Sequence, residues 1–136
     1  MRKLTRPEAI KILKQYIKTK LARLKWFKQI KPYLKAIVFY GSTAKGLNRP
    51  DSDIDILLFV PLHIETKYTK GEYFYKFNGR EINIVLRSME RLRRLGKKQN
   101  DLYEAEVFRK CGILYDSDSE VRTLIKKVRA VRINCK

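Results

Sequence analysis

The sequence predicts an α+β fold, and three features of its 136 residues carry this prediction. Short apolar runs rich in β-branched and aromatic residues alternate with longer segments whose apolar residues recur at helical spacing. Asn78-Gly79 lies between two such runs and is the preferred two-residue turn of a β-hairpin. The chain contains no repeat and no low-complexity linker, so we expect one compact domain over residues 1–136.

The N-terminal segment predicts one long helix over residues 6–29. Thr5 and Glu8 have the spacing of a capping box, and Pro7 suits the first helical turn. Lysines fill most faces of this segment, and Pro32 is expected to end it. The apolar residues that recur at helical spacing are Ile10, Leu13, Ile17, Leu21 and Leu24.

Strands are expected in the middle of the chain. Residues 33–40, YLKAIVFY, form a buried strand that Gly41 ends. Residues 47–52 have the composition of a loop, and residues 53–60, DIDILLFV, form a second strand. Residues 72–88 form the hairpin around the Asn-Gly turn.

The C-terminal part predicts helices with one further strand. Short helices are expected at residues 89–98 and 101–110, and a strand at residues 111–116. Ser117 and Glu120 have the spacing of a second capping box, so a last helix is expected to follow.

The charge of the chain is strongly positive and unevenly distributed. Lys and Arg number 32 against 14 Asp and Glu, for a net charge of +18, and residues 1–35 hold twelve basic residues with Glu8 as the single acid. Such an excess attracts polyanions or acidic partners, although a solvated helix surface has the same composition. No apolar run is long enough to span a bilayer, and the N-terminus lacks a signal-peptide pattern. We therefore expect a cytoplasmic protein without membrane contact.

Two aspartates stand one residue apart at the start of the second strand. Asp53 and Asp55 project from one face of a strand, while Ile54 and Ile56 face the core. Neighbouring carboxylates repel each other unless a cation bridges them. Hard oxygen ligands suit Mg²⁺, which completes its shell with water and substrate phosphate. The pair therefore predicts a magnesium site.

The turn before this strand supplies groups that suit a phosphate. Gly41 lets the backbone approach a phosphate closely, Ser42 adds a hydroxyl, and Lys45 adds positive charge. Together with the two aspartates, these residues predict phosphoryl or nucleotidyl transfer.

This segment resembles the signature of the minimal nucleotidyltransferases of the DNA polymerase beta superfamily. The signature consists of Gly-Ser, ten residues and Asp-x-Asp, and its extended form adds a second glycine, a serine and a final apolar residue. The matching residues are Gly41, Ser42, Gly46, Ser52, Asp53, Asp55 and Ile56. The resemblance covers residues 34–86 and implies a palm-type mixed sheet flanked by helices.

The resemblance also implies a third carboxylate on a neighbouring strand. Residues 81–86, EINIVL, resemble the family segment that carries it, which places Glu81 at the acidic position with a longer side chain than the usual aspartate. Asn83 shares the same strand face and is the competing choice, although an amide cannot act as a base. A cross-strand pair of Glu81 with Lys76 is the purely structural alternative.

The mechanism implied by the resemblance uses two Mg²⁺ ions and ATP. Asp53 and Asp55 would bridge both ions, and Glu81 would hold the ion beside the attacking hydroxyl. The residues implied to bind the nucleotide are Gly41, Ser42, Lys45, Gly46 and Ser52.

Three functions follow as alternatives. The first is an antitoxin-like enzyme, because proteins that resemble this chain transfer AMP from ATP to a tyrosine hydroxyl of a HEPN-domain partner. The second is an RNA-binding or RNA-end nucleotidyltransferase module, which the basic and aromatic residues favour. The third is a noncatalytic interaction subunit that uses a degenerate site to bind a partner.

Overall fold

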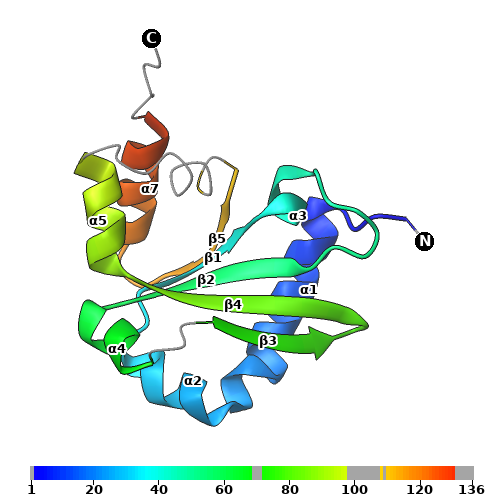
Figure 1. Ribbon diagram of the computed structural model, residues 1–136, viewed down its shortest axis with the longest axis horizontal. Coiled ribbons are helices and arrows are strands. Elements are labelled where there is room, and N and C mark those ends of the chain that lie inside the picture. The colour runs from blue at the N-terminus through cyan, green and yellow to red at the C-terminus, as the bar shows by residue number, and fades with distance from the viewer. Residues whose placement is uncertain (1, 69–71, 98–107, 109, 131–136) are drawn as a thin grey trace.

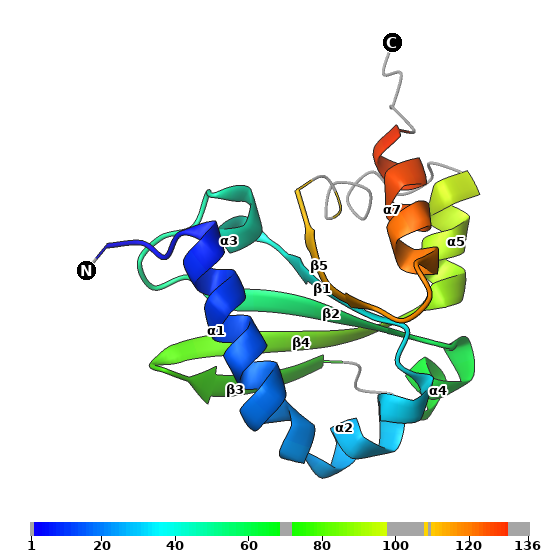
Figure 2. The ribbon, with the colours of Figure 1, turned by 180° about the vertical axis from the view of Figure 1, so that it is seen from behind.

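The protein is a small α+β domain, as the sequence predicts, and Figures 1 and 2 show its computed structural model from opposite sides. The structure describes residues 2–68, 72–97, 108 and 110–130. Its elements in chain order are α1 (Arg6–Thr19), η1 (Leu21–Arg23), α2 (Lys25–Ile30), η2 (Lys31–Tyr33), β1 (Ala36–Tyr40), α3 (Ser42–Lys45), β2 (Ile54–Val60), α4 (Leu62–Lys67), β3 (Glu72–Phe77), β4 (Arg80–Ser88), α5 (Met89–Lys97), β5 (Gly112–Asp116) and α7 (Glu120–Ala130).

A five-stranded mixed sheet in the order β3-β4-β2-β1-β5 forms the centre of the domain. Strands β2 and β4 are parallel neighbours, and the other neighbouring pairs are antiparallel. The predicted hairpin is confirmed, because β3 and β4 pair around Asn78 and Gly79, whose φ angles of 52° and 74° suit the expected turn.

One face of the sheet packs against α1, η1 and α2, and Figure 2 shows α1 running across this face. This face is aliphatic along β2 and β4, as expected for every second residue of a buried strand. Its fully buried side chains from these two strands are Ile54, Ile56, Leu58, Val60, Ile82, Ile84 and Leu86.

The opposite face packs against α5 and α7 over part of its length. The strand residues in this second core include Val38, Leu57, Phe59 and Val85. No helix within the described residues is long and apolar enough to cross a membrane.

The predicted single helix over residues 6–29 is wrong in its middle. Helix α1 ends at Thr19, and Leu24 is extended, with φ −70° and ψ 133°, before α2 begins. The turn lets both segments cover the same sheet face, since Leu13 in α1 and Phe27 in α2 are both buried in its core. Pro32 lies in the short η2 turn and not at the end of a long helix.

The first predicted capping box is confirmed. The Thr5 side chain accepts a hydrogen bond from the Glu8 backbone N–H, and the Glu8 carboxylate accepts one from the Thr5 backbone N–H. These bonds satisfy two backbone donors at the start of α1.

The second predicted capping box is wrong, because α7 begins at Glu120. The carboxylates of Asp116 and Asp118 accept the backbone N–H groups there, from Ser119 and Arg122 and from Glu120 respectively. Ionised carboxylates compete well for these N–H groups at a helix N-terminus.

The remaining expectations for the C-terminal part have different outcomes. The helix over residues 89–98 and the strand over residues 111–116 are confirmed as α5 and β5. The helix expected over residues 101–110 lies outside the described residues, apart from residues 108 and 110. Helix α4 was not predicted, because its six residues contain too few turns to show a period.

Candidate functional site

The turn between β1 and α3 depends on Gly41. Its φ of 87° lies in the region that favours glycine, and a Cβ there would collide with the Asp55 carboxylate. The hydroxyl of Thr43 then donates to the backbone carbonyl of Asp53 over 3.1 Å, which ties α3 to the residue before β2. The turn and the aspartates predicted from the sequence are therefore adjacent.

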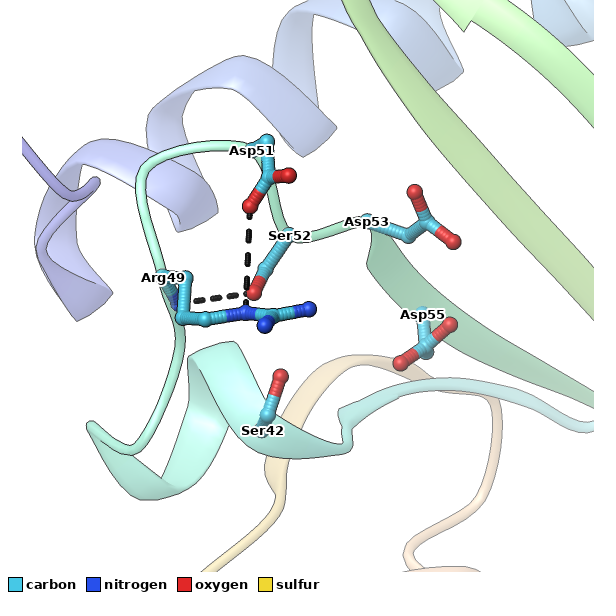
Figure 3. Close-up of a pocket in the computed structure, with 6 residues that line it drawn as sticks. All are labelled: Ser42, Arg49, Asp51, Ser52, Asp53 and Asp55. Carbon is cyan, nitrogen blue, oxygen red and sulfur yellow. Dashed lines mark hydrogen bonds and ion pairs between the residues drawn. The ribbon is translucent and has the colours of Figure 1, made fainter. Parts of the chain in front are cut away.

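The two aspartates share one face, as predicted. Asp53 immediately precedes β2, Asp55 is its second residue, and Figure 3 shows both carboxylates on the same side of the chain. Ile54 and Ile56 are fully buried on the other face. The buried isoleucines thus fix the positions of the two partly exposed carboxylates.

An open polar pocket lies between α3, the loop that precedes β2, and β2 itself (Figure 3). The residues that line it are Ser42, Arg49, Asp51, Ser52, Asp53 and Asp55. Four of these were predicted from the sequence, whereas Arg49 and Asp51 were missed. A loop offers no periodic signal that would single them out.

The loop that carries Arg49 is ordered by hydrogen bonds. The backbone N–H of Arg49 donates to the hydroxyl of Ser52 over 2.7 Å, and Arg80 at the start of β4 donates to the carbonyl of Pro50 over 2.8 Å. The Arg49 guanidinium is 3.9 Å from the Asp51 carboxylate, and both side chains are exposed. An exposed pair of this kind is weak, so the guanidinium is available to an anionic ligand.

Asn83 of β4 contacts both aspartates. The parallel register places it beside Asp55, and its Nδ2 donates to Asp53 Oδ2 over 3.1 Å and to Asp55 Oδ1 over 3.0 Å. Its Oδ1 is buried and has no hydrogen-bond partner among the described residues. Burial raises the pKa of Asp55, the bond from Asn83 opposes that rise, and the charges of Asp53 and Glu81 add to it.

Glu81 lies on the same face of β4 as Asn83, two residues nearer to the hairpin turn. Its charge acts on Asp55, its register partner in β3 is Lys76, and it does not line the pocket. Among the described residues, no three His, Cys, Asp or Glu side chains are grouped closely enough to hold a metal. A metal-binding role for Glu81 therefore stays a prediction.

Lys45 and Gly46, the other predicted nucleotide ligands, stand at the end of α3 and outside the pocket lining. Gly46 has a φ of 76° and caps the helix through bonds from its N–H to the carbonyls of Ser42 and Thr43. Its carbonyl accepts from the Lys3 ammonium over 2.8 Å. The structure thus gives Gly46 a conformational role.

The donor set of the pocket fits a hard divalent cation. Two carboxylates converge on an open space beside the serine hydroxyls, and Mg²⁺ in proteins is typically held by one or two carboxylates with phosphate and water. A cation there would also offset the repulsion between Asp55 and the neighbouring carboxylates, and the energetic cost of burying the Asp55 charge. Asp53 and Asp55 are the residues that would hold it.

Comparison with known proteins agrees with this geometry. Residues 10–109 match the family described as nucleotidyltransferase domain, and no curated protein matches the sequence. The structure of a nucleotidyltransferase-like protein from Exiguobacterium sibiricum 255-15 is similar, with a TM-score of 0.54 and 11% sequence identity. The similar region covers 79% of this chain but 37% of that one. At this identity the similarity shows the fold alone.

Proposed function

Because the chain belongs to the nucleotidyltransferase domain family, we propose that its pocket moves a nucleoside monophosphate, AMP from ATP, to a hydroxyl acceptor. One observation carries the proposal. The carboxylates of Asp53 and Asp55 face the hydroxyls of Ser42 and Ser52 and the guanidinium of Arg49 across a single pocket. Cation ligands and phosphate ligands therefore lie within reach of one triphosphate.

The reaction exchanges one phosphorus–oxygen bond for another. The acceptor oxygen bonds to the α-phosphorus while the bond from that phosphorus to the α–β bridging oxygen breaks. The products are a nucleoside monophosphate ester and pyrophosphate, and the hydroxyl proton passes to solvent. A bound Mg²⁺ would neutralise the charge that develops on the phosphate oxygens.

Five of the residues that line the pocket have a defined part in this step. Asp53 and Asp55 would hold the cation, and the hydroxyls of Ser42 and Ser52 would donate to phosphate oxygens. Arg49 supplies a planar, permanently charged donor that suits phosphate. Lys45 and Gly46 retain the nucleotide-binding role implied by the signature, at the outer end of α3.

The acceptor is proposed on the resemblance of the signature segment. A tyrosine hydroxyl of a HEPN-domain partner would make this chain an antitoxin-like protein adenylyltransferase that acts in the cytoplasm, where ATP and Mg²⁺ are abundant. The surface favours a second candidate, an RNA end. This surface is the outer side of α1 and α2, which carries several exposed lysines. Contacts between lysines and the phosphates of a nucleic acid supply affinity that does not depend on its sequence. These lysines are Lys11, Lys14, Lys18, Lys25 and Lys28.

Transfer of labelled phosphate tests the activity and identifies the acceptor. The chain is incubated with Mg²⁺, a HEPN-domain protein or a short RNA, and ATP labelled at either the α- or the γ-phosphate. We expect label from the α-phosphate alone on one acceptor, and intact mass should show the addition of whole AMP units. Label from the γ-phosphate would instead indicate a kinase.

The Asp53→Asn variant is the matched control for this experiment. It preserves the shape of the side chain and should transfer no label. If the wild-type chain binds ATP yet labels neither acceptor, the noncatalytic interaction subunit becomes the better description.

A further inference from the structure

We propose that this pocket holds a single divalent cation, which enters with the nucleotide, and that Asn83 occupies the position where a second cation would need a third carboxylate. The inference rests on the proposed function, since it concerns the same pocket. Its basis is that the β4 side chain in contact with both aspartates is a neutral amide.

The strand register fixes Asn83 in this position. Strands β2 and β4 are parallel, Asp55 is the register partner of Asn83, and Ile54 and Ile82 form the preceding pair. Glu81 lies two residues from Asn83, which is about 6.5 Å along a strand. The carboxylate nearest to the pair on β4 is therefore displaced toward the hairpin.

The orientation of the amide also opposes a second cation. Its NH₂ group donates to one oxygen of each aspartate, while Oδ1 is buried and meets no partner in the part of the chain that the structure describes. Turning Oδ1 toward the aspartates would remove both hydrogen bonds, so binding of a second cation would have to offset their loss. The amide therefore acts as a donor to the pair and not as a cation ligand.

Asn83 is instead a positioning residue for the two aspartates. Neighbouring carboxylates repel each other unless a positive charge lies between them. The two hydrogen bonds from Asn83 hold these carboxylates close together before any cation binds. Each carboxylate keeps an oxygen that Asn83 does not engage, and both side chains line the open pocket. These oxygens can take one cation together with the phosphates of a nucleotide.

Manganese binding tests the count directly. Mn²⁺ replaces Mg²⁺, and α,β-methylene ATP serves as a nucleotide that cannot be transferred. For the wild-type chain we expect one Mn²⁺ per bound nucleotide and an electron paramagnetic resonance spectrum of isolated ions. For Asn83→Asp we expect two ions per nucleotide and a spin-coupled spectrum, because ions that share ligands lie about 4 Å apart.

Glu81→Gln is the matched control, since it removes a carboxylate from the same strand face. It should retain one ion per nucleotide. Two ions in the wild-type chain that fall to one in Glu81→Gln would overturn the proposal. A single ion in a folded Asn83→Asp variant would also overturn it, because Asn83 would then not mark the third ligand position.

The outcomes separate this inference from the proposed function. A wild-type chain that binds nucleotide with two ions contradicts only the single-cation site. A wild-type chain that binds neither nucleotide nor nucleotide-dependent Mn²⁺ contradicts both proposals. Should Asn83→Asp fail to fold, the wild-type stoichiometry still decides the question.

Discussion

The two faces of β2 and β4 differ most at the end of these strands where the pocket opens, although their residues alternate along the same strands. Isoleucines fill the face toward α1, where Ile54, Ile56 and Ile82 are fully buried. The opposite face carries Asp55 of β2 and Asn83 of β4 at the end where the pocket opens. The difference shows how a strand can anchor a charged site, because each polar residue stands between two core residues that fix its backbone.

The face that carries Asp55 and Asn83 is itself divided along its length. Helices α5 and α7 cover the end formed by Leu57, Phe59 and Val85, and the end formed by the aspartates remains open to a ligand. Stability should therefore depend on the aliphatic face and on the covered part of the other face, and activity on the open end of that other face.

The largest effect on stability is expected from the aliphatic face. Ile56→Ala removes a fully buried side chain and should lower the free energy of unfolding by about 2–5 kcal/mol. Leu62→Ala is the control, because Leu62 is 49% exposed and its loss should change stability by less than about 0.5 kcal/mol. Urea denaturation measures both, and equal effects would contradict the assignment of the core.

Asp55, the neighbour of Ile56 in β2, should affect activity strongly and stability little. Asp55→Asn should lower AMP transfer at least ~100-fold, which is about 2.7 kcal/mol of activation free energy, because the cation loses a charged ligand. Its stability without ligand should be unchanged or higher, since the variant removes a partly buried charge that repels Asp53. Single-turnover transfer and a melting curve test the pair of results. Transfer at the wild-type rate would refute the cation assignment.

Arg49 tests the loop side of the pocket. Arg49→Ala should raise the KM for ATP roughly tenfold, or about 1.4 kcal/mol, and leave stability unchanged because the side chain is exposed. Arg49→Lys should recover only part of the loss, because an ammonium does not bind phosphate through two parallel bonds. An unaltered KM in Arg49→Ala would remove this residue from the nucleotide site.

The smallest effect is expected for Glu81→Gln. Glu81 stands opposite Lys76 across the β3–β4 hairpin, so the substitution should cost less than about 1 kcal/mol of stability. On the single-cation proposal, turnover should stay within about twofold of wild type, because Asn83 is the β4 side chain that contacts both aspartates. A loss of several orders of magnitude would instead assign Glu81 as the third ligand implied by the signature.

Local patterns in the sequence predicted the parts of the site that depend on nearby residues. The shared face of Asp53 and Asp55 follows from the alternation of a strand, and the turn at Gly41 follows from its spacing and residue type. The hairpin turn and the first capping box are equally local, and the structure confirms both.

The remaining features depend on contacts between distant parts of the chain. The break near Leu24 is set by how two helical segments share one sheet face, and helical periodicity continues through it. Asn83 meets Asp55 across 28 residues through the parallel β2–β4 register, which no short motif specifies. Arg49 enters the pocket from a loop whose shape depends on a bond from Arg80 to Pro50.

Thermal unfolding with and without Mg²⁺ and ATP tests the central claim most directly, namely that this pocket binds a nucleotide together with a divalent cation. Wild-type protein should gain about 2.7 kcal/mol at a ligand concentration a hundredfold above the dissociation constant, and only when both ligands are present. The Asp55→Asn variant should show no such gain. A wild-type melting temperature that does not respond to millimolar Mg-ATP, or an equal rise in Asp55→Asn, would contradict the claim.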